Sequence, residues 1–141
     1  MTKPTSNLIL FLSADELSRA DVFSKSDPFV IVSLEEEGTK REIGRTETIN
    51  NSSGPKWVTT IPVTYYFERR QNLVFDIRDD DGGTSYDEIG QAQSSLGSIL
   101  HSLYEGACVL ELSNRKNKPS GWLYWPWLIA ACRARAPCRS A

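Results

Sequence analysis

The chain has 141 residues, of which 40% are hydrophobic and 24% charged. This composition favours one folded domain and excludes global disorder. The formal net charge is −2, and three of the 16 basic residues lie beyond residue 121, whereas all 18 acidic residues lie before it. A general nucleic-acid binder, which needs a basic surface, is therefore excluded.

Short runs rich in Val, Ile, Thr, Tyr and Phe follow one another along the chain, each bounded by turn-forming residues. In chain order these predicted strands are 7–13, 28–34, 40–48, 56–67, 72–79, 88–96, 107–114 and 121–128. Only SSLGSILHSLY, which begins at the end of the sixth run, predicts a short helix. Strands at this spacing predict an all-β sandwich or barrel and argue against an α/β fold.

Five aspartates follow two of the predicted strands: Asp21, Asp27, Asp79, Asp81 and Asp87. The first two come after the first strand and the other three after the fifth. Loops of a hairpin-connected sandwich gather at its two ends, so we expect loops 14–27 and 79–87 to meet. Two carboxylates about 4 Å apart repel by roughly 4 kcal/mol at an effective dielectric of about 20. These side chains are therefore either solvated turn residues or ligands of a cation.

Asp76 belongs to a different class of acidic residue. Alternation in NLVFDIRD puts Leu73, Phe75 and Ile77 on one face of the strand and Asp76 on the other. At about 3.3 Å per residue, Asp76 lies roughly 10 Å from Asp79 along the strand. We therefore expect Asp76 to point away from the core and to take no part in a metal site.

The chemistry of the two acidic loops selects among metals. Calcium accepts six to eight oxygen ligands at about 2.3–2.6 Å with forgiving geometry, whereas magnesium demands a strict octahedron. No His or Cys occurs in either loop, which disfavours zinc and copper. Calcium is the ion that these residues favour, and solvated acids remain the alternative.

The sequence also resembles a known family. LSRADVFSKSDPFVIVSL and IRDDDGGTSYDEIG are similar to the two calcium loops of C2 domains. In finer detail, DVFSKSDPF, GRTETINN, PKW, YYFERRQNLVFDIRD and SSLGSIL resemble, in this order, the first C2 domain of the copines. The resemblance runs from about Asn7 to Gly121.

The resemblance implies an eight-stranded antiparallel β-sandwich of the C2 class with the permuted (type II) topology. It implies calcium-dependent binding to anionic phospholipid, with two calcium ions held by the five aspartates named above and by the backbone carbonyls of Val22 and Asp80. Phe23 is the candidate for shallow membrane insertion, although it could pack beneath its own loop. Lys40, Arg41 and Arg45 are either a basic patch facing lipid or a solvated face.

The C-terminal part departs from the copine pattern. We expect the C2 domain to span 1–128 and a disordered tail to span 129–141, because the tail has an Ala/Arg/Cys/Pro composition without a packing pattern. A truncated or alternatively spliced product is one interpretation of this tail, and an interfacial anchor of Trp and Arg is another. The run LILFL is too short for a signal peptide, so we expect a cytoplasmic protein, recruited to the plasma membrane when calcium rises.

Other classes of function fit less well. The single histidine, His101, has no cluster of acids, bases or nucleophiles around it in the sequence, so no catalytic residues and no enzyme are predicted. The alternative from another class is a calcium-independent protein-interaction module, or a fragment that interferes with a full-length copine. In that case the partner is a protein and the acidic residues are merely solvated.

Overall fold

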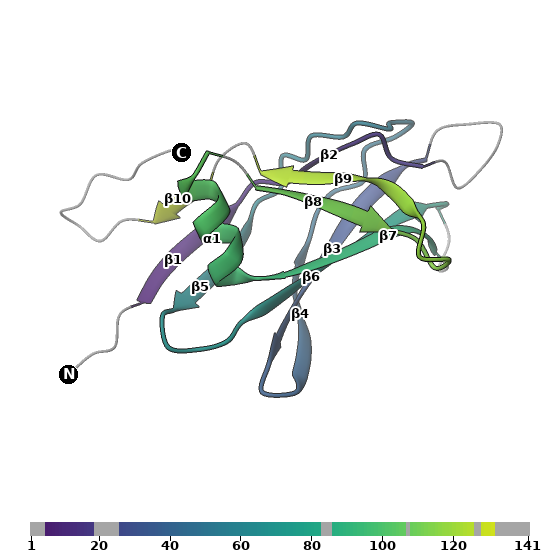
Figure 1. Ribbon diagram of the computed structural model, residues 1–141. Coiled ribbons are helices and arrows are strands. Elements are labelled where there is room, and N and C mark those ends of the chain that lie inside the picture. The colour runs from purple at the N-terminus through teal and green to yellow at the C-terminus, as the bar shows by residue number, and fades with distance from the viewer. Residues whose placement is uncertain (1–4, 19–25, 83–85, 107, 126–127, 132–141) are drawn as a thin grey trace.

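The computed structural model describes residues 5–18, 26–82, 86–106, 108–125 and 128–131. Within these ranges the chain forms antiparallel strands and one helix (Figure 1). The elements are β1 (Thr5–Leu10), β2 (Ser13–Asp15), β3 (Pro28–Glu36), β4 (Thr39–Arg45), β5 (Ile61–Tyr66), β6 (Asn72–Asp80), β7 (Tyr86–Ser95), α1 (Leu96–Tyr104), β8 (Cys108–Ser113), β9 (Pro119–Trp125) and β10 (Leu128–Ala131).

The strands form two sheets that share one hydrophobic core. The smaller sheet has the order β10-β1-β5, and the larger has the order β2-β9-β8-β7-β6-β3-β4. Apolar residues of both sheets, such as Leu10 of β1 and Phe75 of β6, are fully buried in the same cluster. This arrangement is a sandwich, because each sheet buries one face against the other.

The first and last predicted strands are each divided between the two sheets. Run 7–13 is interrupted at Phe11 and Leu12 to give β1 and β2, and run 121–128 gives β9 and β10. The two runs therefore pair with one another twice: β1 pairs with β10 in the smaller sheet, and β2 pairs with β9 in the larger sheet. The predicted eight-stranded sandwich is confirmed as a fold class, with the first and last predicted runs each contributing a strand to both sheets.

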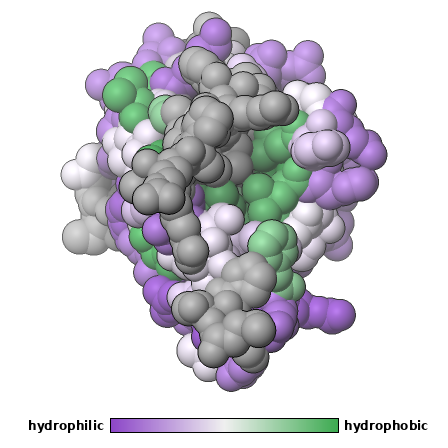
Figure 2. Space-filling model, turned by 90° about the vertical axis from the view of Figure 1, so that its left-hand side faces the viewer, coloured by the Kyte–Doolittle hydropathy of each residue, from purple (hydrophilic) through white to green (hydrophobic). Residues whose placement is uncertain are grey.

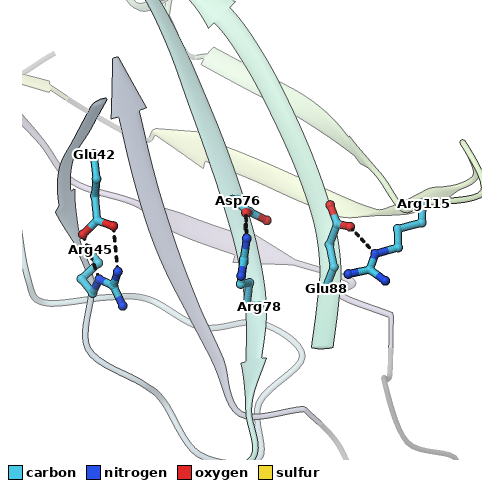
Figure 3. A network of polar contacts seen from close by, with 6 residues as sticks. All are labelled: Glu42, Arg45, Asp76, Arg78, Glu88 and Arg115. Carbon is cyan, nitrogen blue, oxygen red and sulfur yellow. Dashed lines mark hydrogen bonds and ion pairs between the residues drawn. The ribbon is translucent and has the colours of Figure 1, made fainter. Parts of the chain in front are cut away.

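The central strand β6 confirms the predicted alternation. Leu73, Phe75 and Ile77 are fully buried in the core. Asp76 lies on the opposite face of the sheet, where its carboxylate accepts hydrogen bonds of 2.9 and 2.7 Å from Arg78 (Figure 3). Asp76 therefore points away from the core, as expected from the period of two residues in a strand.

The expected helix is present as α1. Ser95 caps its N-terminus, since the Ser95 hydroxyl accepts a hydrogen bond of 3.1 Å from the N–H of Ser98. Leu96, Ile99 and Leu103 are buried against the core, whereas Tyr104 at the other end of the helix is 92% exposed. Figure 2 views the left-hand side of Figure 1, and hydrophobic areas lie there between hydrophilic ones.

The C-terminal boundary falls inside a strand. β10 pairs with β1 from Leu128 to Ala131, so the predicted division between 128 and 129 lies within β10. Residues 132–141 of the predicted tail lie outside the described residues, and their disorder stays a prediction. Within the described part of the chain, no helix is long and apolar enough to cross a membrane.

Candidate metal centre

The start of β3 and the end of β6 bring two of the predicted ligand residues together. Pro28 and Asp79 are partners in the antiparallel register of these strands. The N–H of Asp27 donates a hydrogen bond of 2.7 Å to Oδ1 of Asp79, and the carbonyl of Asp27 accepts one of 2.9 Å from the N–H of Asp80. The start of β3 and the end of β6, where the two acidic loops are attached, therefore meet at one end of the sandwich, opposite α1 in Figure 1.

Two further predicted ligands lie beside this pair. Asp87 on β7 is the register partner of Asp79, and Asp81 follows directly after β6. Burial raises the pKa of Asp79, and the negative charges of Asp27, Asp87 and Asp81 raise it further, although the hydrogen bond from the Asp27 N–H acts in the opposite direction. Three other acids thus act on Asp79 through their charges.

The remaining predicted site residues lie outside the described residues. These are Asp21, the backbone carbonyl of Val22 and the side chain of Phe23. Among the residues that the structure does describe, no group of three or more His, Cys, Asp or Glu side chains is close enough to hold a metal ion. The donors fit a hard cation in chemistry, since all are carboxylate or carbonyl oxygens, but the described residues alone do not form a complete ligand set.

Asp80 differs from its neighbours in the acidic run. Its Oδ1 accepts a hydrogen bond of 2.9 Å from the N–H of Gly82, and its Oδ2 accepts one of 2.8 Å from the hydroxyl of Thr48. These two bonds, the one from Gly82 first, hold the pKa of Asp80 below its usual value. The charge of Asp80 is therefore stabilised by neutral donors, whereas that of Asp79 is opposed by other acids.

The connection between β4 and β5, residues 46–60, contacts both acidic loops. The N–H of Asn51 donates a hydrogen bond of 2.6 Å to Oδ1 of Asp27, and Thr48 bonds Asp80 as described above. The N–H of Ser52 also donates to the carbonyl of Ser26 at 3.0 Å. The sequence of this connection contains many turn-forming residues but carries no signal that pairs Thr48 or Asn51 with a particular aspartate.

Pairs of acid and arginine cover part of the outer face of the larger sheet (Figure 3). They are Glu42 with Arg45 on β4, Asp76 with Arg78 on β6, and Glu88 on β7 with Arg115 in the turn after β8. Arg45, one member of the predicted basic patch, is therefore bonded to an acid at 2.7 Å, while Lys40 and Arg41 are exposed.

Comparison with known proteins identifies this architecture. The family model described as "C2 domain" matches residues 9–119. The chain belongs to the C2 domain family. Copine-A and Copine-E of Dictyostelium discoideum are 38% and 40% identical over 119 and 92 residues, which cover 84% and 60% of the chain. The chain spans only 20% and 16% of the lengths of these two relatives, and its C2 domain is copine-like, which confirms the resemblance seen in the sequence.

Solved C2 domains share the fold. A C2 domain of plant extended synaptotagmin 1 aligns with a TM-score of 0.68 at 19% identity, covering 96% of this chain and 100% of that one. The structure named BON1-C2B aligns with a TM-score of 0.63 at 22% identity, covering 91% and 92%. At these identities the likeness establishes the C2 fold alone.

Proposed function

We propose that this C2 domain binds calcium through Asp21, Asp27, Asp79, Asp81 and Asp87 and thereby docks on anionic phospholipid membranes. The observation that carries the proposal is the environment of Asp79, whose carboxylate accepts a hydrogen bond of 2.7 Å from the N–H of Asp27 and whose charge is opposed by those of Asp27, Asp87 and Asp81. Folding has gathered like charges where a divalent cation would relieve their repulsion. The match to the C2 family supports the same function.

The roles of the chain's own residues follow from this proposal. The five carboxylates would hold two calcium ions, and the carbonyls of Val22 and Asp80 would add oxygen ligands. Bound calcium supplies positive charge and can take phosphate oxygens of lipid as further ligands. Without it the carboxylates repel an anionic head group, so the site works as an electrostatic switch. Phe23 would add a shallow apolar contact, with Lys40 and Arg41 as further lipid-facing charges.

Membrane recruitment is the proposed consequence in the cell. A cytoplasmic domain that gains lipid affinity only with calcium would move to the plasma membrane, whose inner leaflet is anionic, when calcium rises. We propose a binding module, and not an enzyme, because the chemistry assigned to these residues is coordination of a cation without bond making or breaking.

Calcium titration of matched variants tests the metal site. Asp27→Asn should weaken calcium affinity at least about tenfold, equivalent to about 1.4 kcal/mol, since Asp27 lies against Asp79. Asp76→Asn is the control, because Asp76 is bonded to Arg78 on the outer sheet face, and its calcium affinity should stay unchanged. Isothermal titration reads both, and equal loss in the two variants would contradict the assignment.

Thermal unfolding of the unmodified chain is the primary measurement. A metal that binds only the folded state raises the melting temperature by mass action, so millimolar calcium should raise it relative to chelator. Double replacement of Asp79 and Asp81 by Asn should abolish the rise. An unmodified chain that melts at the same temperature in calcium and in chelator, with or without lipid, would overturn the calcium proposal.

Vesicle cosedimentation tests the membrane part. Binding to phosphatidylserine vesicles should require calcium and weaken with salt, because the attraction is charge-based. A variant lacking residues 132–141 removes Arg133, Arg135 and Arg139 but keeps β10, which ends at Ala131. This variant should bind as the full chain does, and binding that disappears with the deletion would assign the membrane contact to the tail.

The second candidate function is a calcium-independent protein-interaction module. It is favoured by the hydrogen bonds that already occupy oxygens of Asp27 and Asp79, from Asn51 and Asp27 respectively. Equal binding of a protein partner in calcium and in chelator, together with no calcium heat in titration, would support it over the first candidate.

A further inference from the structure

Thr48 reaches from the connection between β4 and β5 to the turn that ends β6. Its hydroxyl donates a hydrogen bond of 2.8 Å to Oδ2 of Asp80, 32 residues away in the chain. We infer that Thr48 is a positioning residue of the proposed calcium site, whose hydroxyl fixes the Asp80 carboxylate and with it the turn that carries Asp79 and Asp81. The inference rests on the proposed calcium-binding function.

Asp80 is the point where three segments meet. Its N–H donates to the carbonyl of Asp27 at 2.9 Å, its Oδ1 accepts from the N–H of Gly82 at 2.9 Å, and its Oδ2 accepts from Thr48. Asp80 is thus joined at once to the start of β3, to its own turn and to the connection between β4 and β5. Of these three bonds, only the one to Thr48 depends on the side chain of the partner residue.

Backbone hydrogen bonds fix the residues close to Thr48 against β3. The next residue, Ile49, donates its N–H to the carbonyl of Pro28 at 3.1 Å, and Thr46 donates its N–H to the carbonyl of Val30 at 2.9 Å. Both acceptors belong to β3, whose first residue follows Asp27. The position of the Thr48 hydroxyl is therefore set by a core strand, and a bond to it transmits that position to Asp80.

The expected effect on calcium follows from geometry. A binding site must hold its ligands within about 0.5 Å of the productive arrangement, and order that exists before binding does not have to be created on binding. Asp79 and Asp81 flank Asp80 on either side in the sequence, so movement of Asp80 displaces both. Without the Thr48 hydroxyl, the turn keeps its charges but loses one of the bonds that orders it.

Two variants separate position from charge. Thr48→Val removes the hydroxyl, keeps the branched shape and leaves every charge in place. Asp76→Asn does the opposite, since it removes one negative charge from β6 at a carboxylate bonded to Arg78 on the outer sheet face, and it leaves the bond between Thr48 and Asp80 in place. Thr48→Ser is the rescue variant, because it restores a hydroxyl on the same carbon atom.

Isothermal calcium titration of the full chain, with thermal unfolding in chelator beside it, tests the role. Thr48→Val should weaken calcium affinity by about threefold or more, whereas Thr48→Ser and Asp76→Asn should stay within about twofold of the unmodified chain. Unchanged or tighter calcium binding by Thr48→Val would overturn the inference, even if its melting temperature falls. Greater loss in Asp76→Asn than in Thr48→Val would also overturn it, because charge would then outweigh position.

The unmodified chain distinguishes this inference from the proposed function. Calcium binding by the unmodified chain together with an unaffected Thr48→Val overturns the positioning role alone. An unmodified chain that gives no calcium response overturns the proposed function, and the role of Thr48 at that site falls with it.

Discussion

The backbone N–H of Asp27 donates a hydrogen bond of 2.7 Å to a carboxylate oxygen of Asp79, although the two residues are 52 positions apart. This bond joins the beginning of β3 to the end of β6 and brings one acid against another. The N–H offsets part of the resulting repulsion, but burial, followed by the negative charges of Asp27, Asp87 and Asp81, still raises the pKa of Asp79. The folded chain therefore holds Asp79 in a place where its charge is unfavourable.

Replacement of Asp79 by Asn should stabilise the calcium-free domain at neutral pH. A carboxyl whose pKa is raised by folding favours the folded state only while it is protonated, below its unfolded pKa near 3.8, and this advantage is lost as pH rises through the higher folded pKa. Asn removes the charge and still accepts from the Asp27 N–H. In chelator at pH 7 we expect a gain of about 0.2–1 kcal/mol in the free energy of unfolding, limited by solvent screening.

Urea unfolding at several pH values checks this prediction. The gain should shrink as pH falls through the folded pKa and vanish well below 3.8, where Asp79 is protonated in both states of the chain. In millimolar calcium the order should reverse, with the unmodified chain more stable. Destabilisation by Asp79→Asn in chelator at pH 7 would contradict the electrostatic account of this residue.

Glu47 should show the opposite pH dependence. Burial alone would raise the pKa of Glu47, but hydrogen bonds from the N–H groups of Val58 and Thr59, at 2.7 and 3.0 Å, outweigh it and hold the pKa below 4.5. A lowered pKa contributes stability that is present above the unfolded value and lost as pH falls through the folded value. Glu47→Gln can satisfy only one of the two N–H groups.

The measurement is the difference in melting temperature between the unmodified chain and Glu47→Gln. We expect the variant to be less stable by about 0.5–1 kcal/mol at pH 7, a modest value because Val58 beside it is 82% exposed. The difference should shrink as pH falls below about 4.5. A difference that stays constant down to about pH 3 would show that the carboxylate charge plays no part.

Gln71 should be sensitive even to a substitution of similar shape. It is 2% exposed, its Nε2 donates to the carbonyl of Thr64 at 2.8 Å, and its Oε1 accepts from the N–H of Tyr66 at 2.9 Å. The side chain thus pairs with the outer edge of β5 as a neighbouring strand would. Gln71→Met leaves both backbone groups without this partner, which should cost about 1–3 kcal/mol of unfolding free energy.

Chemical denaturation measures that loss, and size-exclusion chromatography at high concentration gives a second readout. An unpaired strand edge invites pairing with another chain, so Gln71→Met should self-associate more than the unmodified protein. The control is Glu68→Gln, at an exposed position. The neighbouring Asn72 is not used, because its side chain bonds Glu35 and Gln93. A stable, monomeric Gln71→Met would contradict the role assigned to this side chain.

Gly90 should not tolerate a methyl group. A Cβ at this position would overlap the hydroxyl of Ser120 and lie 3.0 Å from Cβ of Leu112. Overpacking of this kind costs about 1–3 kcal/mol. Ser120→Ala removes a buried hydroxyl that has no hydrogen-bond partner among the described residues, so the double variant should recover part of the loss. Additive losses in a double-mutant cycle would show that the two sites do not collide.

Local pattern was enough to orient β6 and to place α1. Successive side chains of a strand point to opposite faces, so Leu73, Phe75 and Ile77 had to be buried together and Asp76 had to lie on the other face. The short helix expected within SSLGSILHSLY is likewise present as α1. These features depend on neighbours in the sequence, and sequence contains that information directly.

The meeting of the two acidic loops could also be anticipated, because short connections in a sandwich leave alternate loops at the same end. The division of the first and last predicted strands between the two sheets could not be anticipated from the sequence. Whether a strand continues from one sheet into the other depends on how the sheets pack, and Phe11 and Leu12 look like ordinary strand residues. The boundary predicted after residue 128 falls inside β10 for the same reason.

Tertiary structure alone decided the state of the individual acids. Asp79, Asp80 and Asp81 are consecutive and chemically identical, yet Asp79 is opposed by other acids while Asp80 is bonded to Gly82 and Thr48. Two of the contacts that make this difference join residues 52 and 32 positions apart along the chain. The sequence by itself determined which residues carry charge and which strands bury their apolar faces. Only folding decided which charges repel and which are stabilised, because electrostatic and hydrogen-bond energies depend on distances between atoms in space.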